Sequence, residues 1–127
     1  MTSKELGQLG EEIAANYLMK SGYRILHRNW RLKGHYEIDI VAFKDNALHF
    51  VEVKTRSTAF MDPLQAVSMQ KIRYVSRAAY MYKKYFRYSF DTRIDAIGIV
   101  YHSENDYDLR LIPDVHLNLT DYRYTRH

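Results

Sequence analysis

The chain has 127 residues, which is long enough for one hydrophobic core and too short for two comfortable domains. Hydrophobic residues make up 46% and charged residues 27%, an ordinary globular balance, and there is no cysteine with which to form a disulfide framework. The net charge of +4 is concentrated in residues 51–90, which hold 8 basic and 2 acidic residues and would attract a polyanion.

The sequence contains no membrane-spanning or targeting signal. No apolar run approaches the length of a membrane span, and the N-terminus lacks the long apolar core of a signal peptide. We therefore expect a cytoplasmic protein without membrane association. Residues 1–116 are predicted to form a single domain, and the tyrosine-rich residues 117–127 a flexible C-terminal tail.

The first predicted element is a helix over residues 4–20. Glu12 lies on a polar stripe of this helix, which is the profile of a solvated face. Glu11 shares its stripe with small and apolar residues that allow close packing on a sheet, namely Gly7, Ala14 and Leu18. Glu11 is therefore the better candidate for a functional acid; the alternative is a first-turn glutamate that the helix dipole favours.

Three strands are predicted next, over residues 24–32, 36–43 and 47–55, because β-branched and aromatic residues run between turn signals. Asp45 and Asn46 separate the last two strands and are typical of a two-residue hairpin loop. The second and third strands are therefore expected to pair as an antiparallel hairpin.

This hairpin would bring four charged residues together. With a loop at positions 45 and 46, Asp39 lies opposite Glu52 and Glu37 lies opposite Lys54. Because side chains alternate along a strand, all four would point to one face, at the end of an apolar stripe. A register shift of one residue would remove Asp39 from this face relative to Glu52.

Two opposed carboxylates are a potential site for a divalent cation. Opposed β-carbons lie roughly 4.5 to 5.5 Å apart, so ionised Asp39 and Glu52 would repel one another unless a cation neutralised them. Mg²⁺, for which Mn²⁺ can substitute, takes one or two carboxylates together with water and phosphate oxygens. Lys54 would then steady an attacking water or the developing negative charge. The alternative is a partly exposed salt-bridge cluster on a solvated sheet face.

A second helix is predicted over residues 63–85, with Asp62 as its N-cap and Pro63 at its first position. Lys71 lies near its start and is expected to point toward the acids. One face carries an exposed polar stripe that a phosphate backbone could follow, formed by Gln70, Arg73, Arg77, Tyr80 and Lys84. An ordinary solvated face explains the same stripe equally well.

Strands over residues 94–101 and 109–112 complete the order αβββαββ. This order predicts an α/β fold with a central mixed sheet flanked by helices.

Several segments together resemble the YraN-type family of small bacterial proteins, within the PD-(D/E)-X-K nuclease superfamily and similar in fold to archaeal Holliday junction resolvases. The segments that carry the resemblance are Gly7-Gln8-Leu9-Gly10-Glu11 with Ala14, Tyr17-Leu18 and Gly22-Tyr23, Asn29 and Arg31, Glu37-Ile38-Asp39, Phe50-Val51-Glu52-Val53-Lys54-Thr55-Arg56, Ala66-Val67 with Lys71, and Arg93-Ile94-Asp95. The resemblance implies a restriction-endonuclease-like fold. It also places Glu11, Asp39, Glu52 and Lys54 on the nuclease catalytic positions.

Together the residues and the resemblance predict a metal-dependent endonuclease that hydrolyses DNA, with branched or junction DNA as one candidate substrate. Asp39, Glu52 and Glu11 would bind the metal. Four basic residues would hold backbone phosphates without reading sequence, namely Arg56, Lys71, Arg73 and Arg77. The rival hypothesis is a non-catalytic DNA-binding or adaptor module with the same fold. A junction substrate with two-fold symmetry would favour a homodimer.

Overall fold

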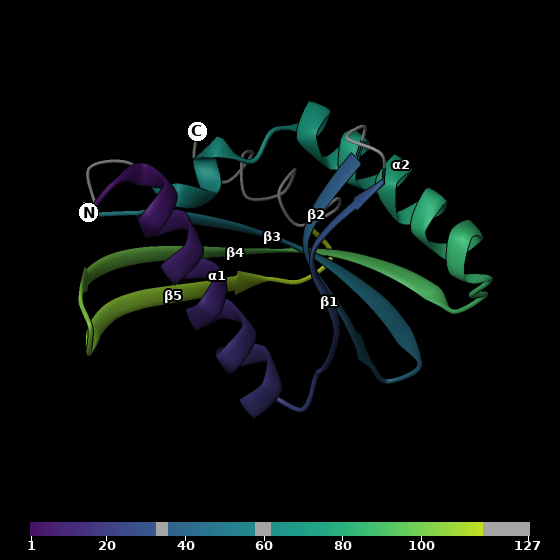
Figure 1. Ribbon diagram of the computed structural model, residues 1–127, viewed down its shortest axis with the longest axis horizontal. Helices are drawn as coiled ribbons and strands as arrows, with labels where there is room; N and C mark the ends of the chain where they lie inside the picture. The colour runs from purple at the N-terminus through teal and green to yellow at the C-terminus, as the bar shows by residue number, and fades with distance from the viewer. Residues whose placement is uncertain (33–35, 58–61, 116–127) are drawn as a thin grey trace.

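The computed structural model describes residues 1–32, 36–57 and 62–115. The tail expected over residues 117–127 lies outside the described residues. The elements follow the predicted order αβββαββ, with a short 3₁₀ helix, η1, before the second long helix (Figure 1). Their bounds are α1 Ser3–Lys20, β1 Arg24–Leu32, β2 Tyr36–Lys44, β3 Ala47–Arg56, η1 Pro63–Ala66, α2 Met69–Phe86, β4 Asp91–Ser103 and β5 Asp106–Ile112.

The five strands form one mixed sheet in the order β1-β2-β3-β4-β5. β3 and β4 are parallel, while the other neighbouring strands are antiparallel. Helices α1 and α2 lie on opposite faces of this sheet (Figure 1). The architecture confirms the predicted α/β fold and is consistent with a restriction-endonuclease-like fold. Neither helix of the described ranges is long and apolar enough to cross a membrane.

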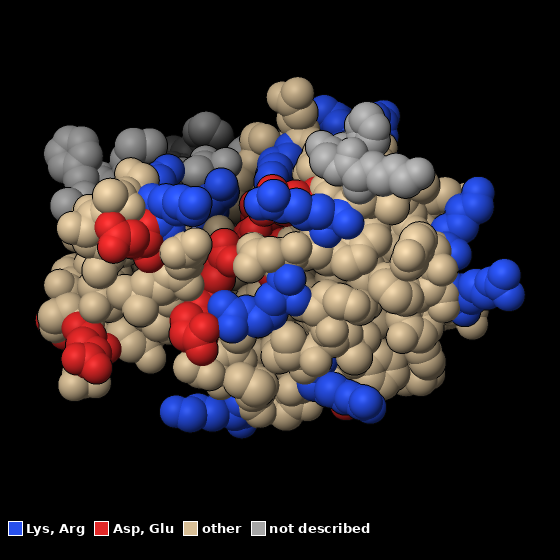
Figure 2. All heavy atoms as spheres, in the orientation of Figure 1, with Lys and Arg blue, Asp and Glu red and all other residues tan. Residues whose placement is uncertain are grey.

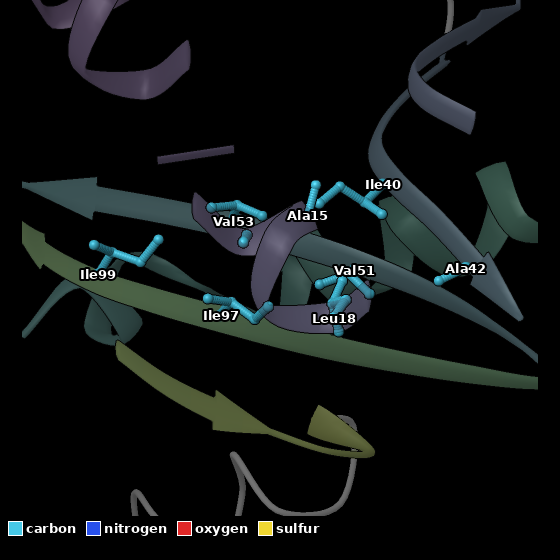
Figure 3. Close-up of a cluster of buried hydrophobic side chains, with 9 residues drawn as sticks. Ala15, Leu18, Ile40, Ala42, Val51, Val53, Ile97 and Ile99 are labelled. Carbon is cyan, nitrogen blue, oxygen red and sulfur yellow. The ribbon is translucent and has the colours of Figure 1, made fainter. Parts of the chain in front are cut away.

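Helix α1 packs closely on β3 and β4. Leu18 and Ala15 contact the apolar side chains of the central strands (Figure 3). Leu18 is fully buried, and burial of a leucine side chain contributes roughly 1.5 to 3 kcal/mol. A β-carbon on Gly10 would lie only 1.8 Å from Thr55 Oγ1, so the helix approaches β3 at a distance that only glycine permits.

Helix α2 covers the other face through Val75, Ala79 and Tyr82, all of which are buried. Its start differs from the prediction, because Pro63–Ala66 forms η1 and α2 begins only at Met69. Leu64 and Val67 are buried in a separate apolar cluster. Val67 has an extended backbone, which separates the end of η1 from the start of α2. Two caps replace the single cap expected at Asp62.

Those two caps are built alike. The Asp62 carboxylate accepts a hydrogen bond from the Leu64 backbone N–H at 3.0 Å at the start of η1. The Ser68 hydroxyl accepts one from the Lys71 backbone N–H at 3.1 Å at the start of α2. The second cap fixes the helical turn from which Lys71 projects.

Strands β4 and β5 are longer than predicted. Their polar ends carry little strand signal, but β4 pairs with β3 from Ala47–Asp91 to Arg56–Val100. Main-chain hydrogen bonding along the full length of β3 therefore extends the strand beyond its apolar residues.

Candidate active site

The predicted β2–β3 hairpin forms, and its register is the expected one. Asp45 and Asn46 both have positive φ, 51° and 62°, as a two-residue type I′ turn requires. The ladder begins at the Lys44–Ala47 pair and ends at the Ile40–Val51 pair. Asp39 and Glu52 occupy the next position of this register.

The two strands separate at Asp39. Its carboxylate Oδ2 accepts a hydrogen bond from the Val53 backbone N–H at 2.9 Å. A side-chain hydrogen bond therefore links β2 and β3 just beyond the last main-chain pair. The expected pairing of Glu37 with Lys54 lies beyond the end of the ladder and is wrong, because β2 continues with β1 alone, where Glu37 pairs with Arg31.

Strand β2 also changes its facing at this point. Ile40 packs in the core beneath α1, whereas Ile38 packs in the core beneath α2, although side chains two residues apart on a regular strand share a face. The neighbouring strand β1 has a matching irregularity at Asn29, whose φ is 51°. Asp39 therefore lies where the strand turns over, within reach of groups from both faces of the sheet.

Burial raises the pKa of Asp39, even though the Val53 N–H, Lys71 and Lys54 all act to lower it. Loss of hydration is therefore the dominant effect at this carboxylate. The negative charge of Asp39 is only partly compensated by the protein itself.

Glu52 is the more strongly perturbed acid. It is 5% exposed, and burial together with the nearby Asp39 raises the pKa of its carboxyl to about 7. The Lys71 ammonium lies 3.5 Å from Glu52 Oε1, which favours the ionised form but does not offset the other two effects. Two acids with raised pKa values in one place are typical of sites that bind a cation or perform catalysis.

Glu11 approaches the same pair from α1. Its stripe is the inward one, as expected, since Ala14 and Leu18 are fully buried, while Glu12 is exposed and pairs with Arg28 at 2.9 Å. Burial raises the pKa of Glu11, and the charge of Asp39 raises it further. Glu11 and Asp39 therefore belong to one electrostatic cluster.

The donor set can be compared with what a metal requires. Within residues 1–32, 36–57 and 62–115, no three acidic or imidazole side chains are close enough to hold a metal ion by themselves. Mg²⁺ needs fewer protein ligands, because it keeps several waters and usually takes one or two carboxylates with substrate phosphates. Asp39 and Glu52 fit this second pattern, and Glu11 adds a third acidic group that interacts with Asp39.

Two lysines complete the site. Lys54 follows Glu52 on the same face of β3 and lowers the pKa of both Asp39 and Glu52. Lys71 approaches from α2, and its ammonium lies 4.8 Å from the centre of the Tyr74 ring, a cation–π distance. These cations come from two elements, and both favour the ionised forms of the same pair of acids.

Two contributing residues could not be assigned from the sequence. Tyr74 reads as a core aromatic, yet its hydroxyl accepts a hydrogen bond from the Glu37 backbone N–H at 2.8 Å while its ring supports Lys71. Asn29 carries a side-chain hydrogen bond to Glu11. Asn29 is among the residues that carry the family resemblance, but its role follows only from the strand irregularity, where it adopts a positive φ.

The remaining predicted phosphate-binding residues lie on the surface. Arg56, Arg73 and Arg77 are exposed, and none of them forms an ion pair with a described residue. Figure 2 shows acidic side chains in the middle of one face, between α1 and the β1–β2 hairpin, with basic side chains beside them. Basic and acidic side chains thus lie next to one another on this face, and the binding of phosphate by Arg56, Arg73 and Arg77 stays a prediction.

The fold and these side chains define a small α/β protein with a restriction-endonuclease-like fold and an acid–lysine cluster where its strands separate. The chain belongs to the uncharacterised protein family UPF0102, the YraN family, whose model matches residues 10–99. A UPF0102 protein of Bacteroides thetaiotaomicron is 50% identical over 102 residues, which cover 80% of this chain and 84% of the relative. One of Caldicellulosiruptor saccharolyticus is 41% identical, covering 88% of this chain and 97% of the relative. The family resemblance is therefore confirmed.

Proposed function

We propose that this protein is a metal-dependent endonuclease that hydrolyses phosphodiester bonds in DNA. The observation that carries the proposal is the juxtaposition of Asp39 and Glu52, two largely buried carboxylates whose pKa values are both raised. Burying two acids side by side opposes folding, and a bound divalent cation of the kind used in phosphoryl chemistry would offset this cost.

Mg²⁺ or Mn²⁺ would be held by Asp39 and Glu52, with Glu11 supporting it, and when bound would supply Lewis-acid stabilisation and a more acidic water. The chain's own residues would do the positioning. Lys54 would orient the attacking water and stabilise negative charge on the phosphate. Lys71 would exchange its 3.5 Å contact with Glu52 for a phosphate oxygen.

Exposed basic side chains would bind the DNA backbone. Arg56 continues β3 beyond Lys54, and Arg73 and Arg77 project from α2. Contacts of this kind fix the position of a nucleic acid without selecting its sequence. The expected enzyme is therefore selective for DNA structure more than for base sequence.

The proposal is tested by substituting residues of the site one at a time. Asp39→Asn and Lys54→Ala should reduce metal-dependent cleavage of labelled DNA by at least about a hundredfold, since each removes a ligand or a charge-stabilising group. Glu37→Gln is the matched control, because Glu37 is an exposed acid two residues from Asp39 and should retain activity.

DNA affinity is measured on the same variants without metal. Cleavage that persists unchanged in Asp39→Asn contradicts the assignment of this site. Binding of DNA with no cleavage by the unsubstituted protein, under any metal condition, would instead identify a non-catalytic DNA-binding module.

A further inference from the structure

A hollow lies at the C-terminal end of α2, away from Lys71 near the start of this helix. It has a volume of about 580 Å³, within the range of small-ligand sites, and opens between the C-terminal half of α2 and the beginning of β4. The residues that define its character are Tyr80, Lys83, Lys84, Arg87, Tyr88 and Thr92. None of the described residues that line it is acidic.

Three cations surround this cavity without a carboxylate partner in the described ranges, namely Lys83, Lys84 and Arg87. Lys83 is held in place, because its Nζ donates a hydrogen bond to Thr92 Oγ1 at 3.0 Å. Basic side chains at a helix C-terminus also complement the helix dipole. That dipole amounts to roughly half an elementary charge, so three cations leave a clear positive excess.

The end of the helix is itself capped. Arg87 adopts a left-handed conformation with φ of 59°, and its backbone N–H donates to the Lys83 carbonyl. The Tyr88 N–H donates to the same carbonyl at 2.9 Å. Because these contacts occupy part of the helix terminus, the cationic side chains remain available to an anion.

Aromatic side chains line the same cavity. Tyr80 is 65% exposed, which is unusual for a large aromatic ring. Tyr88 is partly exposed, and its ring lies 5.7 Å from Phe90 and 6.0 Å from Phe86. The Tyr88 ring is therefore held against other aromatic rings, and the exposed ring of Tyr80 can receive a planar group.

The surface of α2 is also hollowed on the way from this cavity toward the acid–lysine site. A smaller hollow of about 320 Å³ shares Ser76 and Tyr80 with the cavity and extends to Tyr36. The Tyr36 ring lies 5.5 Å from the ring of Tyr74, which in turn supports Lys71 beside Glu52. From position 71 to position 84 the helix rises about 20 Å, so a strand that reaches from the cavity to the acids would span several nucleotides.

From these features we infer that the α2–β4 cavity binds a nucleotide of an unpaired DNA strand that leads to the acid–lysine site. The phosphate contacts Lys84 and Arg87, and the base stacks on Tyr80. A base in duplex DNA has both faces covered by its neighbours, whereas an unpaired base offers a face for stacking on an aromatic side chain. The inference rests on the proposed function for its choice of DNA, and it adds that the substrate contains a single-stranded segment.

The test measures equilibrium binding in EDTA, so that no cleavage is needed. Fluorescence anisotropy compares a labelled single-stranded oligonucleotide with a blunt duplex of equal length, using the full chain. Tyr80→Ala should weaken binding of the single strand roughly fivefold or more and leave duplex binding nearly unchanged, and Tyr80→Phe, which keeps the ring, should restore it. Tyr107→Ala is the matched control, an exposed tyrosine near the β4–β5 turn at the opposite end of the sheet (Figure 1).

A second pair of variants tests the binding of phosphate. Lys84→Gln with Arg87→Gln should lower the slope of log affinity against log salt by about 0.7 for each phosphate that the protein no longer neutralises. Lys20→Gln, at the end of α1, should not change the slope. Figure 2 shows basic side chains over the C-terminal half of α2, at the right edge of the molecule.

The outcomes separate this inference from the proposed function. If Tyr80→Ala and Tyr107→Ala bind the single strand equally while metal-dependent cleavage is retained, the inference is overturned and the nuclease proposal stands. A free mononucleotide that competes as well as the oligonucleotide would also overturn it, because the cavity would then bind an isolated nucleotide and not a strand.

Discussion

A hydrogen bond from the main chain of β3 holds the Asp39 side chain in position. Its carboxylate accepts the Val53 N–H just beyond the last main-chain pair, Ile40–Val51. This contact fixes the side chain where the strand turns over. One hydrogen bond does not compensate for the hydration that the carboxylate loses, and so the pKa of Asp39 remains raised.

Burial of Glu52 predicts a specific pH dependence of stability. The folded protein keeps the Glu52 proton up to a pKa of about 7, whereas the unfolded chain loses it near the ordinary value of 4.5. The folded state therefore binds more protons between these values, and the free energy of unfolding falls as pH rises through this window. Glu52→Gln should remove the contribution of Glu52 to this dependence. The free energy of unfolding of the variant, relative to that of the unsubstituted protein, should therefore be roughly 2 to 3 kcal/mol higher at pH 8 than at pH 5.

The measurement is urea unfolding of metal-free protein at both pH values. Glu104→Gln, at an exposed position in the β4–β5 turn, is the control and should leave the difference unchanged. A Glu52→Gln variant whose stability relative to the unsubstituted protein is the same at pH 5 and pH 8 would refute the raised pKa.

At the scale of elements, the approach of α1 to β3 depends on Gly10. Alanine there would place its β-carbon 1.8 Å from Thr55 Oγ1, so Gly10→Ala should destabilise the protein by about 1 to 3 kcal/mol through overpacking. It should also reduce activity, because the adjacent Glu11 would move with the helix. Denaturant unfolding measures the first effect and DNA cleavage the second.

Gly7 is the matched control for this substitution. A β-carbon there meets nothing within 4 Å, so Gly7→Ala should stabilise α1 by up to about 1 kcal/mol through helix propensity. Equal effects of the two alanines would show that close packing at Gly10 does not position the helix.

The start of α2 allows a similar comparison. Ser68→Ala removes the cap on the Lys71 N–H and should cost about 1 kcal/mol of stability. Ser76→Ala, at an exposed position inside the same helix, should change stability by less than about 0.5 kcal/mol. Thermal unfolding of both variants checks the prediction, and a Ser68→Ala variant as stable as Ser76→Ala would contradict it.

The β2–β3 hairpin and the start of α2 show how much of the fold the sequence could predict. The hairpin follows from Asp45 and Asn46, whose tolerance of positive φ is a local property, and its register follows from the loop length. The start of α2 could not be found in this way. Asp62 and Pro63 are a good local start signal, but burial of Leu64 and Val67 in their own cluster ends the 3₁₀ turn before α2 begins.

At the scale of the whole molecule, the site depends on both layers of helices. Glu11 comes from α1, Lys71 from α2, and the acids between them from the central strands. The sequence predicted that the hairpin register brings Asp39 opposite Glu52 and that Lys71 points toward them. The turn-over of β2 at Asp39 could not be predicted, because it depends on pairing with an irregular β1.

The distribution of positive charge is also a property of the whole molecule. Positive side chains extend along α2 from Lys71 past Arg77 to Lys84, so a polyanion drawn to this helix lies beside the acids. Association with DNA should therefore weaken steeply with salt whether or not the protein cleaves it. A homodimer remains a prediction from the symmetry of a junction substrate.

The central claim is tested most directly by cleavage of labelled DNA by the purified protein. Duplex, single-stranded, flap and four-way-junction DNA are incubated with Mg²⁺, Mn²⁺ or EDTA, beside a Glu52→Ala variant. The account predicts product with either metal, none in EDTA and none from Glu52→Ala, with substrates that contain unpaired strands cleaved best. Product that forms equally in EDTA, or equally with Glu52→Ala, would contradict it.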